Sequence, residues 1–214
     1  MKGSTHFAIG AAIGAAASLY YPFSFNNAAL YLSVASFSAL SADLDGTSLL
    51  SSTLGKVSKS LRDIVLWAGV LLSGVTAYLY FMDDRIHLTV SVVAVTLLLL
   101  GFVSKEGIIR NILVSMVGLG LLYAGWYSEL NWLMGLGGFV AWVPWLKHRG
   151  LTHTIWAVML WGALGWGLQN HLQVPGIMSV SIAGYVSHLL ADTFTPAGVK
   201  WLFPLYNRSI KFRV

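Results

Sequence analysis

Long apolar runs separated by short polar connections dominate the pattern of this chain. A membrane-spanning helix needs about 20 largely apolar residues, because its backbone must satisfy its own hydrogen bonds in lipid. The runs of about this length cover residues 6–21, 28–43, 63–81, 88–103, 108–126, 130–146, 153–169 and 177–193. They predict an all-α fold, a polytopic membrane helix bundle of about eight transmembrane spans within a single integral membrane domain, residues 1–214.

The composition excludes the other broad classes of protein. Hydrophobic residues make up 57% of the 214 residues and charged residues only 10%, whereas soluble domains carry about 25% charged residues. The absence of cysteine excludes a disulfide scaffold and thiolate metal sites. The net charge of +5 does not indicate nucleic-acid binding, because the Lys and Arg residues are scattered in small groups with no continuous basic face.

The positive charges fall on alternate connections between the spans. Of the 13 Lys and Arg residues, all but Arg85 lie in the two terminal tails or in the connections after the second, fourth and sixth spans. Lys and Arg concentrate on the cytoplasmic side of membrane proteins. The pattern predicts a multi-pass protein of the cell inner membrane with both termini cytoplasmic. A signal peptide starting at Lys2 is the alternative interpretation of the first run, but the match of His6 to the polar pattern below favours a retained helix.

Histidine and aspartate residues collect at the predicted cytoplasmic ends of the spans. The set comprises His6, Asp43, Asp45, His148, His153, His188 and Asp192. His188 and Asp192 are spaced i, i+4, so both side chains lie on one face of the last span. Ionisable residues near membrane depth are costly and are usually functional. His87 and His171 fall on the opposite side of the membrane and are expected to be ordinary interfacial histidines.

Two irregular segments are expected to direct their polar residues inward. His148 and His153 lie on either side of Gly150, and Thr152 is the expected N-cap of the seventh span. The two carboxylates of the stretch A-D-L-D-G, residues 42–46, would diverge on a helix. We therefore expect a frayed helix end or a loop that presents both of them.

Imidazole and carboxylate groups form a donor set that suits zinc, and also manganese or iron. The seven residues therefore predict a divalent metal site, with zinc as the first choice and one or two ions bound. Arg149 is the expected holder of a phosphate anion, because a guanidinium group binds phosphate through two parallel hydrogen bonds. Asp45 or Asp192 is the expected acceptor of the proton of an attacking water molecule.

Four motifs resemble the YdjM-like family of inner-membrane proteins, which are regarded as metal-dependent hydrolases. The motifs are T-H-F-A-I-G at 5–10, A-D-L-D-G at 42–46, H-R-G-L-T-H-T at 148–154 and Y-V-S-H-L-L-A-D-T-F-T-P-A-G-V at 185–199. They lie within residues 1–62 and 147–214, so residues 63–146 are expected to be an inserted module of four spans. In this family a His usually follows the second Asp, where the present chain has Gly46, and this departure bears on whether a second ion binds.

The predicted function is hydrolysis, at the cytoplasmic membrane face, of a lipid or another amphipathic phosphoester-type substrate. The expected partner is a membrane lipid or a lipid-linked substrate, and a homo-oligomer stays open. One alternative is a cation transporter or channel, whose site would lie closer to the bilayer midplane. Another is a non-catalytic membrane protein with a structural metal or a metal-free polar cluster.

Overall fold

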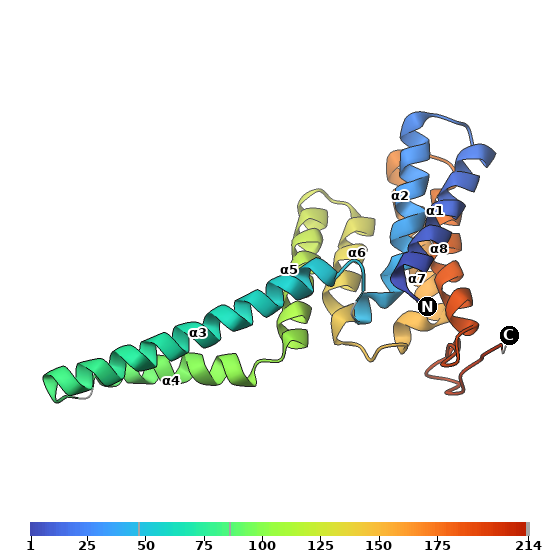
Figure 1. Ribbon diagram of the computed structural model, residues 1–214. Helices are drawn as coiled ribbons and strands as arrows, with labels where there is room; N and C mark the ends of the chain where they lie inside the picture. The colour runs from blue at the N-terminus through green and yellow to red at the C-terminus, as the bar shows by residue number, and fades with distance from the viewer. Residues whose placement is uncertain (47, 86, 213–214) are drawn as a thin grey trace. The chain divides into compact units, whose positions relative to one another are not determined.

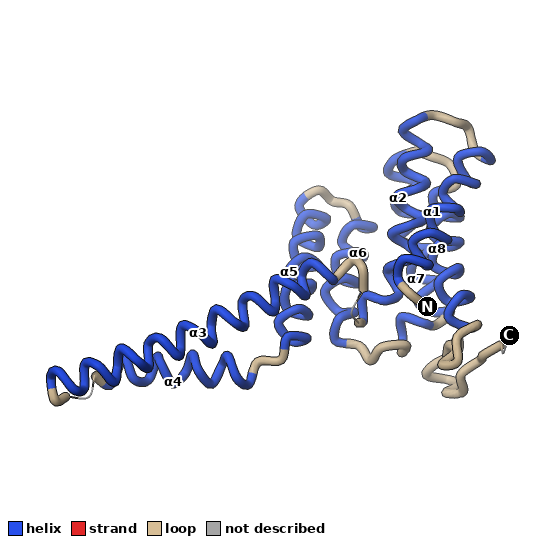
Figure 2. Tube along the Cα trace, in the orientation of Figure 1, coloured by secondary structure: helices blue, strands red, loops and turns tan. Residues whose placement is uncertain are grey.

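The computed structural model describes residues 1–46, 48–85 and 87–212, which fold as helices joined by loops (Figures 1 and 2). The α-helices are α1 Gly3–Tyr20, α2 Phe25–Ser41, α3 Ser52–Asp83, α4 Leu88–Val103, α5 Glu106–Tyr127, α6 Asn131–Trp142, α7 Ile155–Leu172 and α8 Ile177–Thr193. Three short 3-10 helices are η1 Ala42–Asp45, η2 Val143–Trp145 and η3 Leu151–His153. The all-α prediction is confirmed for the described residues.

Two of these helices have the length and apolar composition of a membrane span. They are α3, with 32 residues, and α5, with 22 residues. The other helices contain between 12 and 18 residues, fewer than the roughly 20 that cross a hydrocarbon core of about 30 Å. Eight complete crossings therefore stay a prediction.

The described chain forms two compact units. The first unit contains Met1–Ser52 and Val114–Val214, and the second contains Thr53–Leu113. In the first unit α1, α2, α7 and α8 pack together, and α6 packs against α7. The four-span insert expected over residues 63–146 has other bounds than this second unit, and it stays a prediction.

Glycine residues allow the backbones of α1, α2 and α8 to approach closely. A Cβ atom at Gly10 would lie 2.9 Å from the carbonyl oxygen of Ala35, and one at Gly14 would lie 2.5 Å from Cα of Leu32. A Cβ atom at Gly184 of α8 would lie 2.6 Å from the same Ala35 oxygen. Small residues at helix interfaces are typical of membrane bundles, and here they bring α1 and α8, which carry His6, His188 and Asp192, close to α2, which η1 follows.

Two helix boundaries differ from the sequence predictions. Helix α3 begins at Ser52, although the sequence pattern predicted a connection up to residue 62. Lys56, Lys59 and Arg62 made this segment polar, but their spacing of three residues keeps them near one face of an amphipathic helix. Helix α6 ends at Trp142 instead of residue 146, because Pro144 lacks the backbone N–H that would continue the helix.

Candidate metal centre

The structure brings all seven predicted histidine and aspartate residues together in the first unit. Residues of four segments contribute, namely α1, η1, the chain just before and within η3, and α8. We call these residues the His/Asp cluster; its members are His6, Asp43, Asp45, His148, His153, His188 and Asp192. Five of them are buried, whereas Asp43 is partly exposed and His148 is exposed.

Short 3-10 turns orient the central residues of the cluster. Helix α2 stops at Ser41 and continues as η1, in agreement with the expected frayed end. Before η3, Arg149 adopts a φ of 59°, and the chain turns so that the rings of His148 and His153 lie with centroids 5.6 Å apart. The expected N-cap was wrong: Thr154 caps α7 through a hydrogen bond from the Ala157 N–H.

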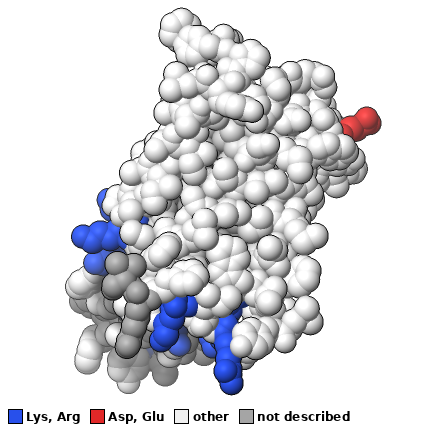
Figure 3. Space-filling view, turned by 90° about the vertical axis from the view of Figure 1, so that its right-hand side faces the viewer, with Lys and Arg blue, Asp and Glu red and all other residues white. Residues whose placement is uncertain are grey.

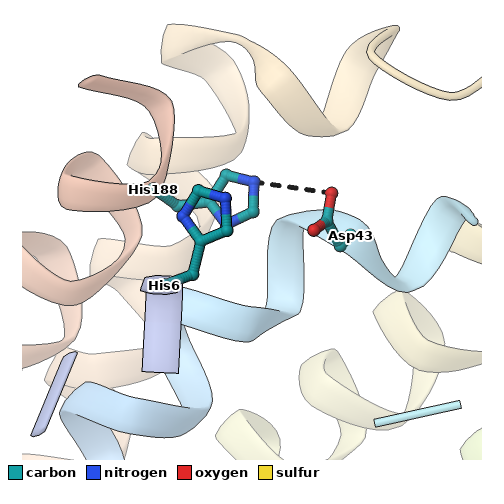
Figure 4. Close-up of side chains that lie close together, drawn as sticks. All are labelled: His6, Asp43 and His188. Atoms are coloured by element: carbon teal, nitrogen blue, oxygen red, sulfur yellow. Dashed lines mark ion pairs between the residues drawn. The ribbon is translucent and has the colours of Figure 1, made fainter. Parts of the chain in front are cut away.

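Two histidines stack at the centre of the cluster (Figure 4). The rings of His6 and His188 lie with centroids 3.8 Å apart and an interplanar angle of 16°. Nε2 of His188 lies 3.5 Å from Oδ1 of Asp43, and Nε2 of His6 lies 3.4 Å from Oδ1 of Asp192. Helices α1 and α8 thus present their imidazoles to carboxylates of η1 and α8.

The third central histidine reaches both of these carboxylates. Nε2 of His153 lies 3.7 Å from Oδ1 of Asp43 and 3.7 Å from Oδ2 of Asp192. An N–H···O hydrogen bond is shorter, about 2.7–3.2 Å. Donor atoms placed about 2.0–2.2 Å from one tetrahedral ion lie about 3.3–3.6 Å apart. The spacing of the Nε2 and carboxylate oxygen atoms is therefore closer to that of ligands around a shared ion.

Hydrogen bonds at the Nδ1 atoms fix the orientation of two of these imidazoles. His188 Nδ1 lies 2.6 Å from the carbonyl oxygen of Ala39, to which it donates. His153 Nδ1 lies 2.9 Å from the hydroxyl of Thr152, which in turn donates to Oδ2 of Asp45 over 2.6 Å. Both rings then carry their proton on Nδ1, so that the lone pair of Nε2 faces the cluster. Metal-binding histidines are held by such outer hydrogen bonds.

The Nε2 atoms of His6, His153 and His188 are buried and have no hydrogen-bond partner within the described residues. A buried polar atom without a partner costs about 1–3 kcal/mol. These atoms face Asp43 and Asp192 and belong to two overlapping groups that could hold an ion, one of His6, Asp43 and His188 and one of His153, His188 and Asp192. The donor set of neutral imidazoles and carboxylates therefore fits a divalent metal such as zinc.

Asp45 holds the chain before η3 in place. Its Oδ1 accepts a hydrogen bond from His148 Nδ1 over 2.7 Å, and its Oδ2 accepts from the backbone N–H of Arg149 over 3.0 Å and from Thr152. The hydrogen bond to Asp45 raises the pKa of the His148 imidazole, although partial burial opposes this shift. Asp43, Asp45 and His148 also lie close enough together to hold an ion.

Asp192 is shared between the cluster and two cationic groups. Nη2 of Arg149 lies 2.9 Å from its Oδ2, and the amino group of Met1 lies 2.6 Å from its Oδ1. Nη1 of Arg149 donates to the Thr195 hydroxyl and to the Gly198 carbonyl, both over 3.3 Å. The guanidinium group is therefore held between α8 and the segment that follows it.

The two remaining histidines lie outside the cluster. His87 pairs with Asp83 at 3.1 Å on an exposed part of the second unit, and His171 packs near Trp132, with ring centroids 6.0 Å apart. The sequence also missed two supporting groups. The Thr152 hydroxyl lies within the motif H-R-G-L-T-H-T, but no sequence signal could have indicated the backbone carbonyl of Ala39.

The described chain is all-α, two of its helices have the length and apolar composition of a membrane span, and its buried His/Asp cluster is a candidate metal centre. The chain belongs to the YdjM inner membrane protein family, whose family model matches residues 1–214. This confirms, over the full chain, the resemblance carried by the four motifs. No curated protein and no solved structure gives a significant match.

Proposed function

We propose that this protein is a metal-dependent hydrolase whose site lies at the cytoplasmic face of the inner membrane. Its substrate is a lipid or another amphipathic molecule with a phosphoester-type bond. The observation that supports the proposal best is the group of three buried Nε2 atoms, from His6, His153 and His188, which lack hydrogen bonds and surround carboxylate oxygens.

Five side chains, in two overlapping groups, would hold one or two ions. They are His6, His153 and His188 through Nε2, Asp43 through Oδ1, and Asp192. A bound divalent metal, with zinc as the first choice and manganese or iron as the others, lowers the pKa of a water molecule and polarises a phosphoryl oxygen. The Nδ1 hydrogen bonds of His153 and His188 keep the two rings in the orientation and tautomer that this role requires.

Asp43 is the carboxylate best placed to accept a proton from water. The sequence pointed to Asp45 and Asp192, but both oxygens of each already interact with cationic or hydrogen-bond donor groups. Asp43 Oδ1 faces His153 and His188, and in the part of the chain that the structure describes its Oδ2 accepts no hydrogen bond. Its side chain is 18% exposed, so water can reach it.

Arg149 would position the anionic group of the substrate. Its guanidinium is 24% exposed and is held by Asp192, Thr195 and Gly198. A guanidinium fixed in this way keeps a charged edge beside the cluster without losing further side-chain freedom when the substrate binds. Its attraction to a phosphoryl group is reduced, but not removed, by the pairing with Asp192.

A structural metal is the second candidate function, because the cluster offers more than three protein ligands. Structural zinc sites are closed by four protein ligands, whereas catalytic sites keep a position for water. The exposed fraction of Asp43 favours the catalytic interpretation. A cation transporter is less well supported, because the cluster is formed by helix ends and 3-10 turns.

The test begins with the metal content of the purified protein, measured by elemental analysis. We expect a stoichiometric divalent metal in the wild type and in the control variant His171→Ala, and its loss in His153→Ala and His188→Ala. The loaded protein is then screened for phosphate release from phospholipids and lipid phosphates. Absence of metal after metal is supplied would overturn the proposal. Bound metal without turnover of any lipid would favour the structural role.

A further inference from the structure

A cavity of about 510 Å³ lies beside the His/Asp cluster, between the chain before η3 and the carboxy-terminal segment. We call it the cationic cavity; its polar lining includes Lys147, His148, Arg149, Lys200, Asn207 and Ser209. No aspartate or glutamate is among its lining residues. The charge of this lining favours an anionic ligand.

Two lysines leave the cationic cavity with a positive charge that no carboxylate neutralises. Lys200 Nζ donates to the neutral amide oxygen of Asn207 over 2.6 Å, and within the described residues neither Lys147 nor Lys200 forms an ion pair. Figure 3 shows Lys and Arg side chains near the lower end of the face in view, with no acidic side chain among them. Arg149 and His148 differ, because Asp192 and Asp45 partly balance their charge.

His148 and Arg149 connect the cationic cavity to the cluster. His148 lines the cavity and bonds to Asp45, and Arg149 lines the cavity and bonds to Asp192. An anion bound in this cavity would therefore contact the two residues that bond to Asp45 and Asp192 of the cluster.

A second cavity, of about 210 Å³, is lined in part by the same chain segment. We call it the apolar cavity; its lining includes Trp142, Leu146, Leu151, Thr152, Trp156 and Leu160. Leu146 and Leu151 line both cavities. A ligand with a charged group in one cavity and an apolar part in the other would pass over these two leucines, next to the residues of η3.

We propose that the two cavities together bind an anionic lipid with a single chain. Its phosphate occupies the cationic cavity, and the first part of its chain occupies the apolar cavity. At about 30 Å³ for a water-sized group, the 210 Å³ of the apolar cavity holds roughly seven such groups, which fits a segment of one chain. The inference rests on the proposed function, because it names the substrate class of that site.

The test measures equilibrium binding of three probes to the full chain in amphipol, so that no detergent competes for the apolar cavity. The probes are lysophosphatidic acid, which has both a phosphate and one chain, monoacylglycerol, which has only the chain, and glycerol 3-phosphate, which has only the phosphate. We expect lysophosphatidic acid to bind most tightly. A protein that binds the phosphate as a free ion would bind glycerol 3-phosphate equally well, which would overturn the lipid assignment.

Substitutions separate the two cavities. The double variant Lys147→Gln, Lys200→Gln should weaken lysophosphatidic acid binding about tenfold or more, because charge-assisted hydrogen bonds to the phosphate are lost. Monoacylglycerol has no phosphate, so its binding should stay unchanged. The control for this double variant is Lys105→Gln, in the other unit.

The apolar cavity is tested by Ala157→Leu, because Ala157 lines it and a leucine there should fill it. This variant should weaken the binding of both chain-bearing probes but not of glycerol 3-phosphate. Its control is Ala183→Leu, at an exposed position of α8.

The result for lipid binding can be separated from the result for the proposed hydrolase function, since the metal content is measured on the same samples. Metal retained in the lysine variant together with unchanged lysophosphatidic acid affinity would overturn this inference alone. Lysine-dependent binding to a protein without metal would support the two-cavity site and overturn the hydrolase proposal.

Discussion

The hydroxyl of Thr152 links two residues of the cluster, because it accepts from His153 Nδ1 and donates to Asp45. Thr152→Val keeps the shape of the side chain and removes this link. We expect the affinity for zinc to fall about 10–100-fold, as for other losses of an outer hydrogen bond to a metal ligand. Competition with a chromogenic chelator measures the change.

The matched control is Thr76→Val in α3, whose hydroxyl donates only to the Leu72 carbonyl of its own helix over 2.8 Å. Both variants remove one hydroxyl from a threonine, so only the local role differs. Equal zinc affinity of Thr152→Val and wild type would show that the Nδ1 hydrogen bond of His153 does not support metal binding.

We predict that Gly46 limits the binding of a second ion. A Cβ atom at this position would lie 3.3 Å from Nδ1 of His148, next to the group formed by Asp43, Asp45 and His148. An added imidazole would supply the neutral donor that this group needs, and the φ of −145° at Gly46 accepts a side chain. We therefore expect Gly46→His to raise the bound metal by about one ion per chain.

Elemental analysis after equilibration with zinc and removal of the free ion measures this change. Gly46→Ala is the control, because it adds the same Cβ atom without a donor and should leave the metal content unchanged. A metal content that is the same in Gly46→His and Gly46→Ala would refute a second site at this position.

The sequence predicted the members of the cluster better than their individual roles. The residue type, His or Asp, and the predicted cytoplasmic end of a span were sufficient to select seven residues from segments far apart in the chain. The roles depend on distances of a few ångströms that no spacing reveals. Asp45 and Arg149 were expected to act on water and on substrate, but their hydrogen bonds show that each also holds neighbouring chain segments in place.

At the scale of secondary-structure elements, the packing of α1 on α2 positions His6. Gly14→Ala would place a methyl group 2.5 Å from Cα of Leu32, so the helices must separate. We expect the free energy of unfolding to fall by about 1–3 kcal/mol. Zinc affinity should fall as well, because α1 carries His6 into the cluster. Denaturant titration in detergent and chelator competition measure the two effects.

Gly138→Ala in α6 is the control, since no atom lies within 4 Å of the added Cβ. Glycine costs about 0.5–1 kcal/mol relative to alanine inside a helix, so this variant should be as stable as the wild type or more stable. A Gly14→Ala protein that matches Gly138→Ala in stability and zinc affinity would contradict the role of close packing.

Helix boundaries were predictable only where apolar composition and helical structure coincide. The start of α3 was missed because residues 52–62 contain Lys56, Lys59 and Arg62, and a count of apolar residues treats such a segment as a connection. The end of α2 was placed more closely, since two aspartates and Gly46 stop an apolar run. The 3-10 helices η1 and η3 carry Asp43, Asp45 and His153 of the cluster. A pattern of membrane spans does not predict such short helices.

At the scale of the whole molecule, the distribution of Lys and Arg predicts the side of the membrane on which the cluster lies. The chain contains no cysteine, so single introduced cysteines report their own location through a maleimide that cannot cross the membrane. We expect Asn207→Cys to be labelled only after permeabilisation of spheroplasts, because the basic carboxy-terminal tail is predicted to be cytoplasmic. Asn26→Cys and Gln173→Cys should be labelled in intact spheroplasts.

A fourth variant, Asp84→Cys between α3 and α4, tests the number of spans. Labelling in intact spheroplasts would support crossings by both helices, since the eight-span prediction places this connection outside. Labelling only after permeabilisation would show that α3 and α4 do not cross as a pair and would reduce the number of spans. The cluster would still lie on the cytoplasmic side, because removing two crossings leaves every later connection on the same face. Only a labelled Asn207→Cys in intact cells would place the proposed site on the other side of the membrane.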